Sequence, residues 1–338
     1  KSSGRNFWKN FIMKILFYTT CRDLKTGSYR IWINDLNQYF NECGIKSDIA
    51  DRNTDINNYD VIICGKPDVT SAINIKKKYP NKKVGIINLS ADKKNLPIDF
   101  VIVGSIEEKD SLSHYDNVFL FPLIEKMYQN SDLKIHTKKN KLRLGFHGHY
   151  PHLSKFEPGL KLAIENIDKI YDVELLVITS NKNYNWKYGR PNIDNIILKG
   201  WDLLTIKKDL ASCDIGLVPN VTYIPFCDKK FPISVDKGLY KTDHIMRMKN
   251  KSNAGRAFVF HQLGIPVVAD FTPSNFHILG DSRNGYLAHN SKTWERSILE
   301  LFDHEKRQKM AKSAKREFDR LYDPLEWTQR LYYNMERV

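Results

Sequence analysis

Short apolar runs recur along the first part of the chain, and polar or mixed segments separate them. Runs of about four to eight apolar residues bounded by Gly, Asn or Asp are typical of buried strands. They predict strands at 13–19, 45–50, 60–65, 84–89, 100–104 and 118–122. Between the first two, Ser28 is a good N-cap for a helix whose apolar positions recur on one side until Gly44. Strands that alternate with helices indicate a parallel sheet with crossover connections.

The pattern stops at 129–141, which is polar and rich in Lys and Asn, and then starts again. The second half predicts strands at 142–146, 173–179, 196–200, 214–219, 265–269 and 285–288. Helical patterns occupy 160–170, 203–212, 294–302, 305–321 and 324–336. We therefore expect two doubly wound α/β units, the first over 13–128, joined by a linker over 129–141. Sheets of this kind bind ligands at the carboxyl ends of their strands.

Residues 1–12 do not continue the strand that starts at Met13, and we interpret them as a leader or an added segment. An alternative is that Phe7, Trp8 and Phe11 dock on a membrane. No apolar run approaches the ~20 residues of a membrane-spanning helix. No secretory signal pattern is visible either.

The composition is that of a folded protein, with 41% hydrophobic and 27% charged residues in a chain of 338. The five cysteines are scattered and form no C-x-x-C pair, which favours reduced thiols over disulfides or a metal site. We expect a cytoplasmic protein, with the inner face of the membrane as a possible peripheral location.

The net charge of +14 points to an anionic partner. Nucleotides, phospholipid surfaces, acidic glycans and nucleic acids all fit, but the chain has no helix-turn-helix, zinc-finger or RNA-binding signature. We therefore expect no nucleic acid. One dense basic run covers 76–78, 82–83 and 93–94, and we interpret it as a solvated face.

The stretch 251–270 carries the clearest candidate chemistry. A polar turn with Lys251 and Arg256 opens a short helix, Gly264 ends that helix, and 266–269 reads as a buried strand. Cations and free N–H groups at a helix N-terminus form an anion site, and a nucleoside diphosphate suits it. The alternative is a solvated, capped helix start.

A second candidate is the loop after the strand at 142–146, with His147, Gly148, His149, His152 and Lys155. Glycine permits close backbone approach to a phosphate. Three histidines also suggest zinc, but their spacing matches no standard ligand set and no cysteine is near. No D-x-D triplet occurs in the chain, so we expect neither a metal nor any other cofactor.

Four segments together resemble the GT-B glycosyltransferases, in particular the retaining group 1 enzymes of bacteria: 144–148, 197–201, 213–219 and 264–269. The resemblance implies two Rossmann-like domains that face each other across a cleft. It places the acceptor domain at 13–128 and the nucleotide-sugar donor domain at 142–320. It also implies that a C-terminal helix, 321–338, crosses back to the first domain.

The resemblance further implies transfer of a hexosyl or related sugar from a UDP- or GDP-linked donor to a glycan or lipid-linked glycan, as in polysaccharide biosynthesis. Lys251 and Arg256 would be catalytic, because they would stabilise the departing diphosphate. The implied donor-binding residues are His147, Gly148, Lys199, Gly200, Trp201, Ser252, Asn253 and Gly255. The implied acceptor-side residues are Arg22, Asp23, Gly27 and Ser28. From the chain itself, the polar residues that follow the strand at 265–269 are candidates to line the cleft: Asp270, Thr272, Ser274 and Asn275. The long segment 220–250 is either a lid or acceptor-binding insertion, or an ordinary excursion between two core elements.

The chain departs from group 1 at one point. That group carries two glutamates eight positions apart, and Val259 stands where the second is expected. No glutamate occurs anywhere in 221–290. The departure keeps other functions open: a nucleotide-sugar epimerase, a polyol-phosphate transferase, or a non-catalytic glycan-binding relative.

Overall fold

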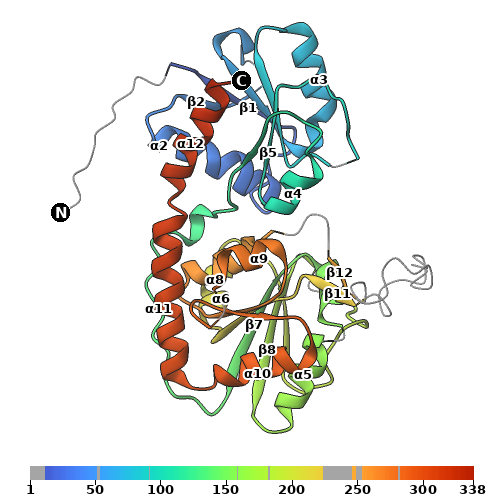
Figure 1. Cartoon of the computed structure of the whole chain (residues 1–338), viewed down its shortest axis with the longest axis vertical. Helices are drawn as coiled ribbons and strands as arrows, with labels where there is room; N and C mark the ends of the chain where they lie inside the picture. Colours follow the sequence, from blue (N-terminus) through green and yellow to red (C-terminus); the bar gives the residue numbers. More distant parts are fainter. Residues whose placement is uncertain are drawn as a thin grey trace, which may run out of the picture. The chain divides into compact units, whose positions relative to one another are not determined.

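The structure is a computed structural model that describes residues 12–51, 54–90, 92–157, 159–181, 183–223, 246–248, 253–280 and 282–338. The chain divides into two compact units (Figure 1). Unit 1 comprises Lys1–Gly104, Leu112–Phe121 and Pro324–Val338. Unit 2 comprises Ser105–Ser111 and Pro122–Asp323.

Unit 1 contains, in its described part, a six-stranded parallel sheet in the order β2-β1-β3-β4-β5-β6. The strands are β1 (Ile15–Tyr18), β2 (Ser47–Ile49), β3 (Val61–Cys64), β4 (Lys83–Ile87), β5 (Phe100–Val103) and β6 (Val118–Leu120). The helices are α1 (Gly27–Tyr29), α2 (Leu36–Glu42), α3 (Val69–Lys78) and α12 (Pro324–Glu336). All six strands predicted for this half are confirmed, because apolar runs such as 61–64 are buried on both faces of the sheet.

The helix predicted from Ser28 is not one regular α-helix. It begins at Gly27, and a π-helical segment, Arg30–Asp35, separates α1 from α2. Arg30 and Asp35 are both buried there, and Arg30 Nη1 donates to the carbonyl of Leu24 at 2.9 Å. Ser28 lies inside α1 and is therefore not its N-cap.

The C-terminal helix α12 packs in unit 1 against α2. The hydroxyl of Tyr332 accepts hydrogen bonds from the backbone N–H groups of Ile12 at 2.9 Å and Met13 at 3.0 Å. Lys83 Nζ donates to the last carbonyls of α12, those of Met335 and Glu336, at 2.9 and 2.8 Å. A lysine of the dense basic run thus caps a helix, which is favourable at a helix C-terminus.

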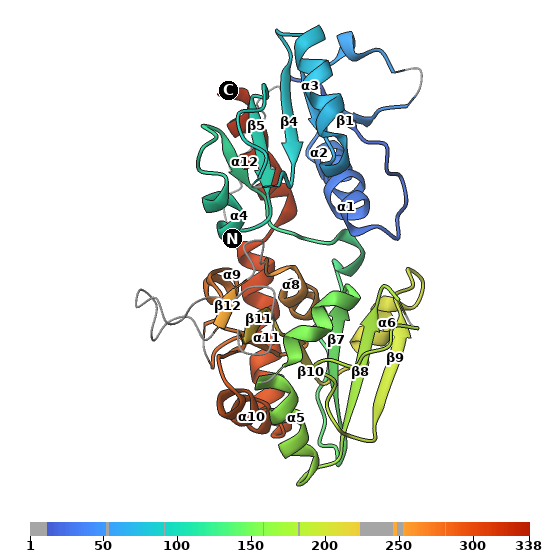
Figure 2. The same ribbon diagram turned by 90° about the vertical axis from the view of Figure 1, so that its right-hand side faces the viewer.

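Unit 2 contains a second parallel sheet, six-stranded within the described ranges, in the order β14-β13-β10-β7-β8-β9 (Figure 2). Its strands are β7 (Leu142–Gly148), β8 (Val173–Thr179), β9 (Ile196–Gly200), β10 (Ile215–Val218), β13 (Val267–Asp270) and β14 (Tyr286–Ala288). Its helices are α4 (Ile106–Ser111), α5 (Gly159–Asp168), α6 (Ile206–Ala211), α8 (Gly255–Gln262), α9 (Pro273–Ile278), α10 (Ser291–Glu300) and α11 (His304–Leu321). A separate antiparallel pair joins β11 (Val221–Tyr223) to β12 (Met246–Met248).

Helices cover both faces of this second sheet. Leu144 and Phe146 of β7 pack in one core cluster with residues of α5 and α10. A Cβ atom at Gly145, between them, would approach Phe260 of α8 at 3.6 Å, so α8 lies on the other face. Side chains alternate along a strand, which is why one strand serves both layers. The strands predicted for the second half are confirmed.

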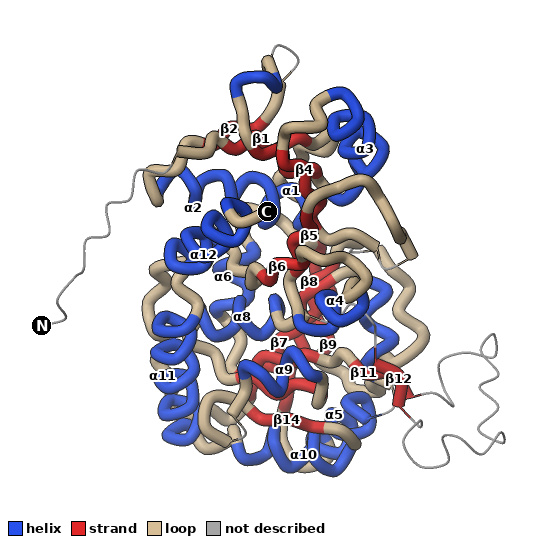
Figure 3. The backbone as a smooth tube through the Cα atoms, turned by 45° about the horizontal axis from the view of Figure 1, so that its top comes forward, coloured by secondary structure: helices blue, strands red, loops and turns tan. Residues whose placement is uncertain are grey.

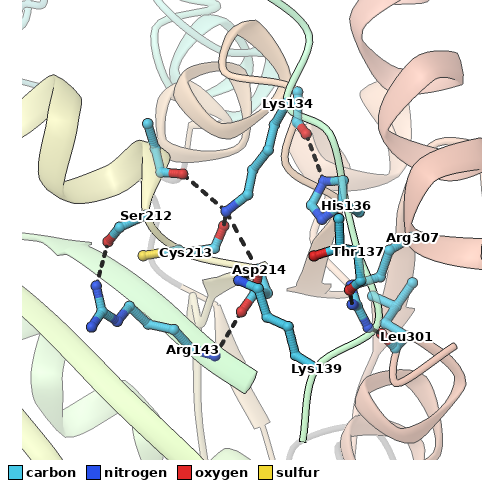
Figure 4. A network of polar contacts seen from close by, with 12 residues as sticks. Lys134, His136, Thr137, Lys139, Arg143, Ser212, Cys213, Asp214, Leu301 and Arg307 are labelled. Atoms are coloured by element: carbon cyan, nitrogen blue, oxygen red, sulfur yellow. Dashed lines mark hydrogen bonds and ion pairs between the residues drawn. The ribbon is translucent and has the colours of Figure 1, made fainter. Parts of the chain in front are cut away.

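Residues 129–141, predicted to be a linker, hold no strand and are anchored to unit 2 (Figure 4). Lys139 Nζ lies 2.6 Å from Asp214 Oδ1, and Lys134 Nζ donates to the carbonyls of Ala211 and Cys213. Burial raises the pKa of Asp214, but the Arg143 N–H and the lysines outweigh burial and hold the pKa below its ordinary value.

The same segment is bonded to α8 and α11. The ring of His136 is buried, with Nε2 2.9 Å from the carbonyl of Gly264, and burial lowers the pKa of His136 to about 4. Arg307 Nη2 donates to the carbonyl of Thr137 at 2.7 Å. Arg307 is 0% exposed, so this contact is one of the most buried charged contacts of unit 2.

The four described cysteines carry free thiols. Cys64 and Cys213 are buried and Cys21 and Cys43 are half-buried, while Cys227 lies outside the described residues. Burial raises the pKa of Cys213 to about 12, which leaves it an unreactive thiol. In the part of the chain that the structure describes, no helix has the length and apolar character needed to cross a bilayer.

Candidate anion-binding site at the carboxyl edge of the second sheet

Three neighbouring parallel strands of unit 2 end at one edge of the sheet. β7 ends at Gly148, β10 at Val218 and β13 at Asp270, and β10 pairs with both of the others. Figure 1 shows α8 and α9 together at one end of unit 2, with α10 at the opposite end. This edge is where a doubly wound sheet holds its ligands.

Arg256, in the first turn of α8, brings a cation to this edge. Its Nη2 donates to the carbonyl of Pro219, just after β10, at 2.9 Å. Its guanidinium carbon lies 5.4 Å from the ring centre of Phe146, so the cation rests on an aromatic face. Burial lowers the pKa of Arg256 to about 10, and the charge of Asp270 opposes this effect. The side chain is therefore positively charged at neutral pH.

One nitrogen of this guanidinium is unused. Nη1 of Arg256 is buried and has no hydrogen-bond partner among the described residues. A buried polar group without a partner costs about 1–3 kcal/mol, and more when it is charged. A hydrogen-bond acceptor that reached Nη1, which the folded chain covers here, would recover that free energy.

Gly148 brings the backbone at the end of β7 close to Arg256. Its φ of +155° lies where residues other than glycine are strained. A Cβ there would lie 3.3 Å from Phe146 Cζ, 3.5 Å from His152 Nδ1 and 3.6 Å from Arg256 Cδ. The backbone at the end of β7 therefore lies close to the side chain of Arg256.

His147 takes a different place from the one predicted. Its ring is buried and lies edge-on to Phe260, with 5.3 Å between the ring centres. Strand side chains alternate, so His147 points to the face opposite that of Phe146 and Gly148. Its side chain belongs to the packing between β7 and α8. Among the described residues, no three His, Cys, Asp or Glu side chains are placed to share a metal ion.

The start of α8 is shaped by Asn253 and Gly255. Asn253 Oδ1 accepts from the backbone N–H of Gly255 at 3.3 Å, and Ala254 supplies no side-chain cap. The next N–H groups of the first turn have no partner within the helix, as at any helix N-terminus. Lys251 and Ser252 lie outside the described residues.

The residues at the end of β9 are partly committed to the fold. Lys199 Nζ pairs with Asp209 Oδ1 at 2.8 Å, so its charge is already neutralised. Gly200 lies opposite Thr179 of β8, and the N–H of Trp201 donates to the carbonyl of Thr179 at 2.8 Å. Thr179 also pairs with Gly148, so positions 148, 179 and 200 form a row along the edge.

Thr179 was missed by the sequence analysis. It is 0% exposed, and its hydroxyl has no partner among the described residues. The only available signal is its position as the last residue of an apolar strand, next to the polar Ser180.

The polar residues after β13 serve mainly to build the edge. Asp270 accepts from the N–H of Asn220 at 2.6 Å and from Trp294 Nε1 at 3.2 Å. The hydroxyl of Thr272 caps α9 by accepting from the N–H of Asn275 at 3.3 Å.

Ser274, at the start of α9, is also occupied. Its N–H donates to Glu107 Oε1 at 3.0 Å, and its hydroxyl donates to the other carboxylate oxygen. Glu107 comes from α4, more than 160 residues earlier, and sequence analysis did not link it to this edge. These contacts occupy Asp270 and Ser274, whereas Oδ1 of Asn275 is buried and has no hydrogen-bond partner among the described residues.

The acceptor-side candidates lie in unit 1, after β1. Arg22 and Asp23 are exposed, and Asp23 Oδ1 accepts from the N–H of Lys25 at 2.9 Å. Gly27 and Ser28 form the first turn of α1. This loop follows the carboxyl end of β1, an inner strand of the first sheet.

No family model matches the chain, and no curated protein matches it. Among solved structures, HepE from Anabaena, in complex with UDP and glucose, aligns over 97% of this chain and 100% of its own, with 12% identity and a TM-score of 0.62. Sucrose-phosphate synthase from Thermosynechococcus elongatus aligns over 96% and 98%, with 10% identity and a TM-score of 0.61. The DNA-modifying enzyme beta-glucosyltransferase aligns over 96% and 100%, with 15% identity and a TM-score of 0.57.

Likeness at these identities establishes the fold. The chain has the α/β fold of GT-B proteins, with two Rossmann-like units, each built on a parallel sheet. The predicted fold class is confirmed.

Proposed function

We propose that this chain is a glycosyltransferase that takes a sugar from a nucleoside-diphosphate-sugar donor and transfers it to a glycan or lipid-linked glycan. The observation that carries the proposal is the guanidinium of Arg256, held at the carboxyl edge of the second sheet by the carbonyl of Pro219, with Nη1 unpaired among the described residues. The shared fold supports it, since HepE was crystallised with UDP-glucose and beta-glucosyltransferase with uridine diphosphoglucose.

In the proposed reaction, the bond between the anomeric carbon and the β-phosphate oxygen breaks. The electron pair stays on that oxygen, so the leaving diphosphate gains negative charge. The anomeric carbon bonds to the oxygen of an acceptor hydroxyl, whose proton passes to an oxygen of the departing diphosphate. Arg256 donates from Nη1 to a diphosphate oxygen. A charge-assisted hydrogen bond contributes about 1.5–3 kcal/mol, and it strengthens as charge develops on the leaving group.

The rest of the proposed clamp comes from backbone and a second cation. The N–H groups of the first turn of α8 point out of the helix N-terminus, which favours an anion by about 0.3–1 kcal/mol. Gly148 lets the diphosphate approach the backbone. On the sequence alone, we assign the second cation to Lys251 and a donor-binding role to Ser252.

The proposal includes no metal cofactor, because protein cations take that role and the sequence has no D-x-D triplet. It includes retention at the anomeric carbon, on the resemblance to group 1 enzymes alone. Val259, where that group has a glutamate, is 0% exposed in the core of α8. Any sugar-handling side chain must therefore come from another position.

The test compares Arg256→Met with Arg256→Lys and with Arg296→Gln, a control at an exposed arginine on α10. Calorimetry with UDP and GDP measures affinity, and donor hydrolysis measures turnover. Loss of one charged hydrogen bond predicts about 10–150-fold weaker nucleotide binding for Arg256→Met. Arg256→Lys keeps a positive charge but loses the planar set of guanidinium N–H donors, so we expect a loss of nucleotide affinity between those of the parent and Arg256→Met. Arg296→Gln should bind like the parent.

Three outcomes would redirect the proposal. If no nucleoside diphosphate or nucleotide sugar binds the parent protein, the glycosyltransferase assignment is wrong. If the protein releases an isomer of the free nucleotide sugar, or consumes a CDP-alcohol, the epimerase or polyol-phosphate alternative replaces it. If nucleotide binds but neither hydrolysis nor transfer follows with any acceptor, the site is that of a non-catalytic relative.

A further inference from the structure

A row of cations runs along the exposed side of α11. Lys309, Lys312, Arg316 and Arg320 are all exposed, and their spacing is three, four and four residues. With 3.6 residues per turn, the four fall within an arc of about 80° and span about 16 Å of helix. We call these four residues the α11 stripe. The opposite side of the helix is buried through Met310, Ala311, Ala314 and Phe318.

The charges of the stripe are not used inside the protein. Among the described residues, none of the four has an ion-pair or hydrogen-bond partner. The cations of α11 that are paired lie off the stripe: Lys306 with Glu300, and Lys315 with Asp319. Four unpaired cations in one line create a positive potential along this side of α11, where the exposed carboxylates are Glu305, one turn before Lys309, and Asp319, which pairs with Lys315.

An exposed apolar side chain flanks the stripe. Ile135 is 79% exposed, although its neighbours in the chain are bonded to α11. The N–H of His136 donates to Gln308 Oε1 at 2.7 Å, and Gln308 Nε2 donates to the carbonyl of Lys134 at 3.2 Å. These bonds hold Ile135 beside the helix with its side chain in solvent. Figures 1 and 3 both show α11 along the outer side of unit 2.

We propose that the α11 stripe, with Ile135, is a docking surface for an anionic lipid bilayer. A straight line of long, flexible cations matches a flat surface of negative headgroups. An exposed isoleucine beside it gains free energy by entering the interfacial region, which a soluble polyanion does not offer. The surface also lacks the aromatic side chains on which single-stranded nucleic acids stack. This docking surface is independent of the proposed glycosyltransferase activity.

The test is sedimentation of the full-length protein with phosphatidylcholine vesicles, with and without phosphatidylglycerol. We expect binding only to the anionic vesicles, and weaker binding as salt is raised. Each cation near such a surface contributes about 1 kcal/mol, or about fivefold in the partition coefficient. The variant K309Q/K312Q/R316Q/R320Q should therefore bind several hundredfold more weakly, by about 10²–10³. Ile135→Ser should lower binding by about three- to tenfold and leave its salt dependence unchanged.

The matched control removes the same charge from the dense basic run of unit 1. Lys77, Lys78, Lys93 and Lys94 are exposed, so K77Q/K78Q/K93Q/K94Q lowers the net charge equally. We expect the control to lose less than about threefold, because separate surface charges are screened beyond about 10 Å. Melting curves check that both variants fold.

The proposal is wrong if both quadruple variants lose binding equally, since total charge would then explain it. It is also wrong if the stripe variant binds anionic vesicles like the parent, or if the parent binds a DNA oligonucleotide or an acidic polysaccharide through the stripe but ignores the vesicles.

Discussion

Arg307→Met tests how strongly residues 129–141 are built into unit 2. Arg307 is 0% exposed, and its guanidinium donates to the carbonyls of Leu301 at 2.6 Å, Phe302 at 2.9 Å and Thr137 at 2.7 Å. The first two carbonyls end α10, where no helical N–H can reach them. One side chain therefore ties together α10, α11 and the segment that precedes β7.

Methionine fills most of the same volume but leaves three carbonyls without a donor. Each unpaired carbonyl lowers the free energy of unfolding by about 1–3 kcal/mol. The substitution also removes the cost of burying a charged guanidinium, which offsets part of this loss. We expect unit 2 to lose about 2–4 kcal/mol. Arg307→Lys keeps a charge that reaches fewer carbonyls, so about 1–2 kcal/mol is expected.

Thermal melting and hydrogen exchange measure the effect. For a domain of this size, 1 kcal/mol shifts the melting temperature by about 2–4 °C, so Arg307→Met should melt about 4–16 °C lower. Amide exchange should accelerate first around Thr137 and at the end of α10. Arg296→Gln, at an exposed site, serves as the control. A melting temperature for Arg307→Met within the error of the parent, with unchanged exchange at Thr137, would refute the reasoning.

Two further predictions concern pH and the anion site. Burial lowers the pKa of both His136 and His261 to about 4 from 6.5, so between these values the unfolded chain binds more protons than the folded one. The free energy of unfolding should therefore fall as the pH drops from 6.5 toward 4, and melts at about pH 7.5 and about pH 5 should show a shallower dependence for His261→Gln. Gly148→Ala places a methyl group 3.3 Å from Phe146 and 3.6 Å from Arg256 in a strained backbone. It should weaken nucleoside diphosphate binding at least about tenfold by calorimetry, and unchanged affinity would remove Gly148 from the site.

Most strands and helices could be predicted from the sequence, because buried elements show a local pattern of apolar residues. The inner strands, such as β3, correspond to apolar runs, because a parallel strand covered on two faces has no polar side to interrupt it. The edge strand β2 differs, since it reads Ser-Asp-Ile and is only partly buried. The π-helical turn at 30–35 was not readable, because it depends on buried polar contacts such as that of Arg30 with Leu24. Residues 129–141 look like a linker for a similar reason. Their side chains and backbone carbonyls, such as Lys134 Nζ and the carbonyl of Thr137, bind partners that lie far away in the sequence.

The candidate site was readable only in part. Arg256 and Gly148 were predicted from the turn before a helix and the glycine after a strand, and the fold brings them together. Lys199 was predicted to bind the donor, but in the structure its ammonium group pairs with Asp209. Glu107 and Thr179 carried no usable signal. Each reaches the carboxyl edge only because strands and helices from separate parts of the chain meet there.

Local pattern was thus sufficient for the order of strands and helices, and so for the two-unit α/β fold and the edge at which a ligand belongs. Folding alone established which charges remain unpaired. In the dense basic run, Lys76 forms an ion pair with Asp99 and Lys83 donates to a carbonyl at the end of α12. By contrast, the four cations of the α11 stripe lie in one line on the helix surface without a partner among the described residues. A hydrogen bond requires its two atoms within about 3 Å, and distances of that kind between remote residues are set by the packing of the folded chain.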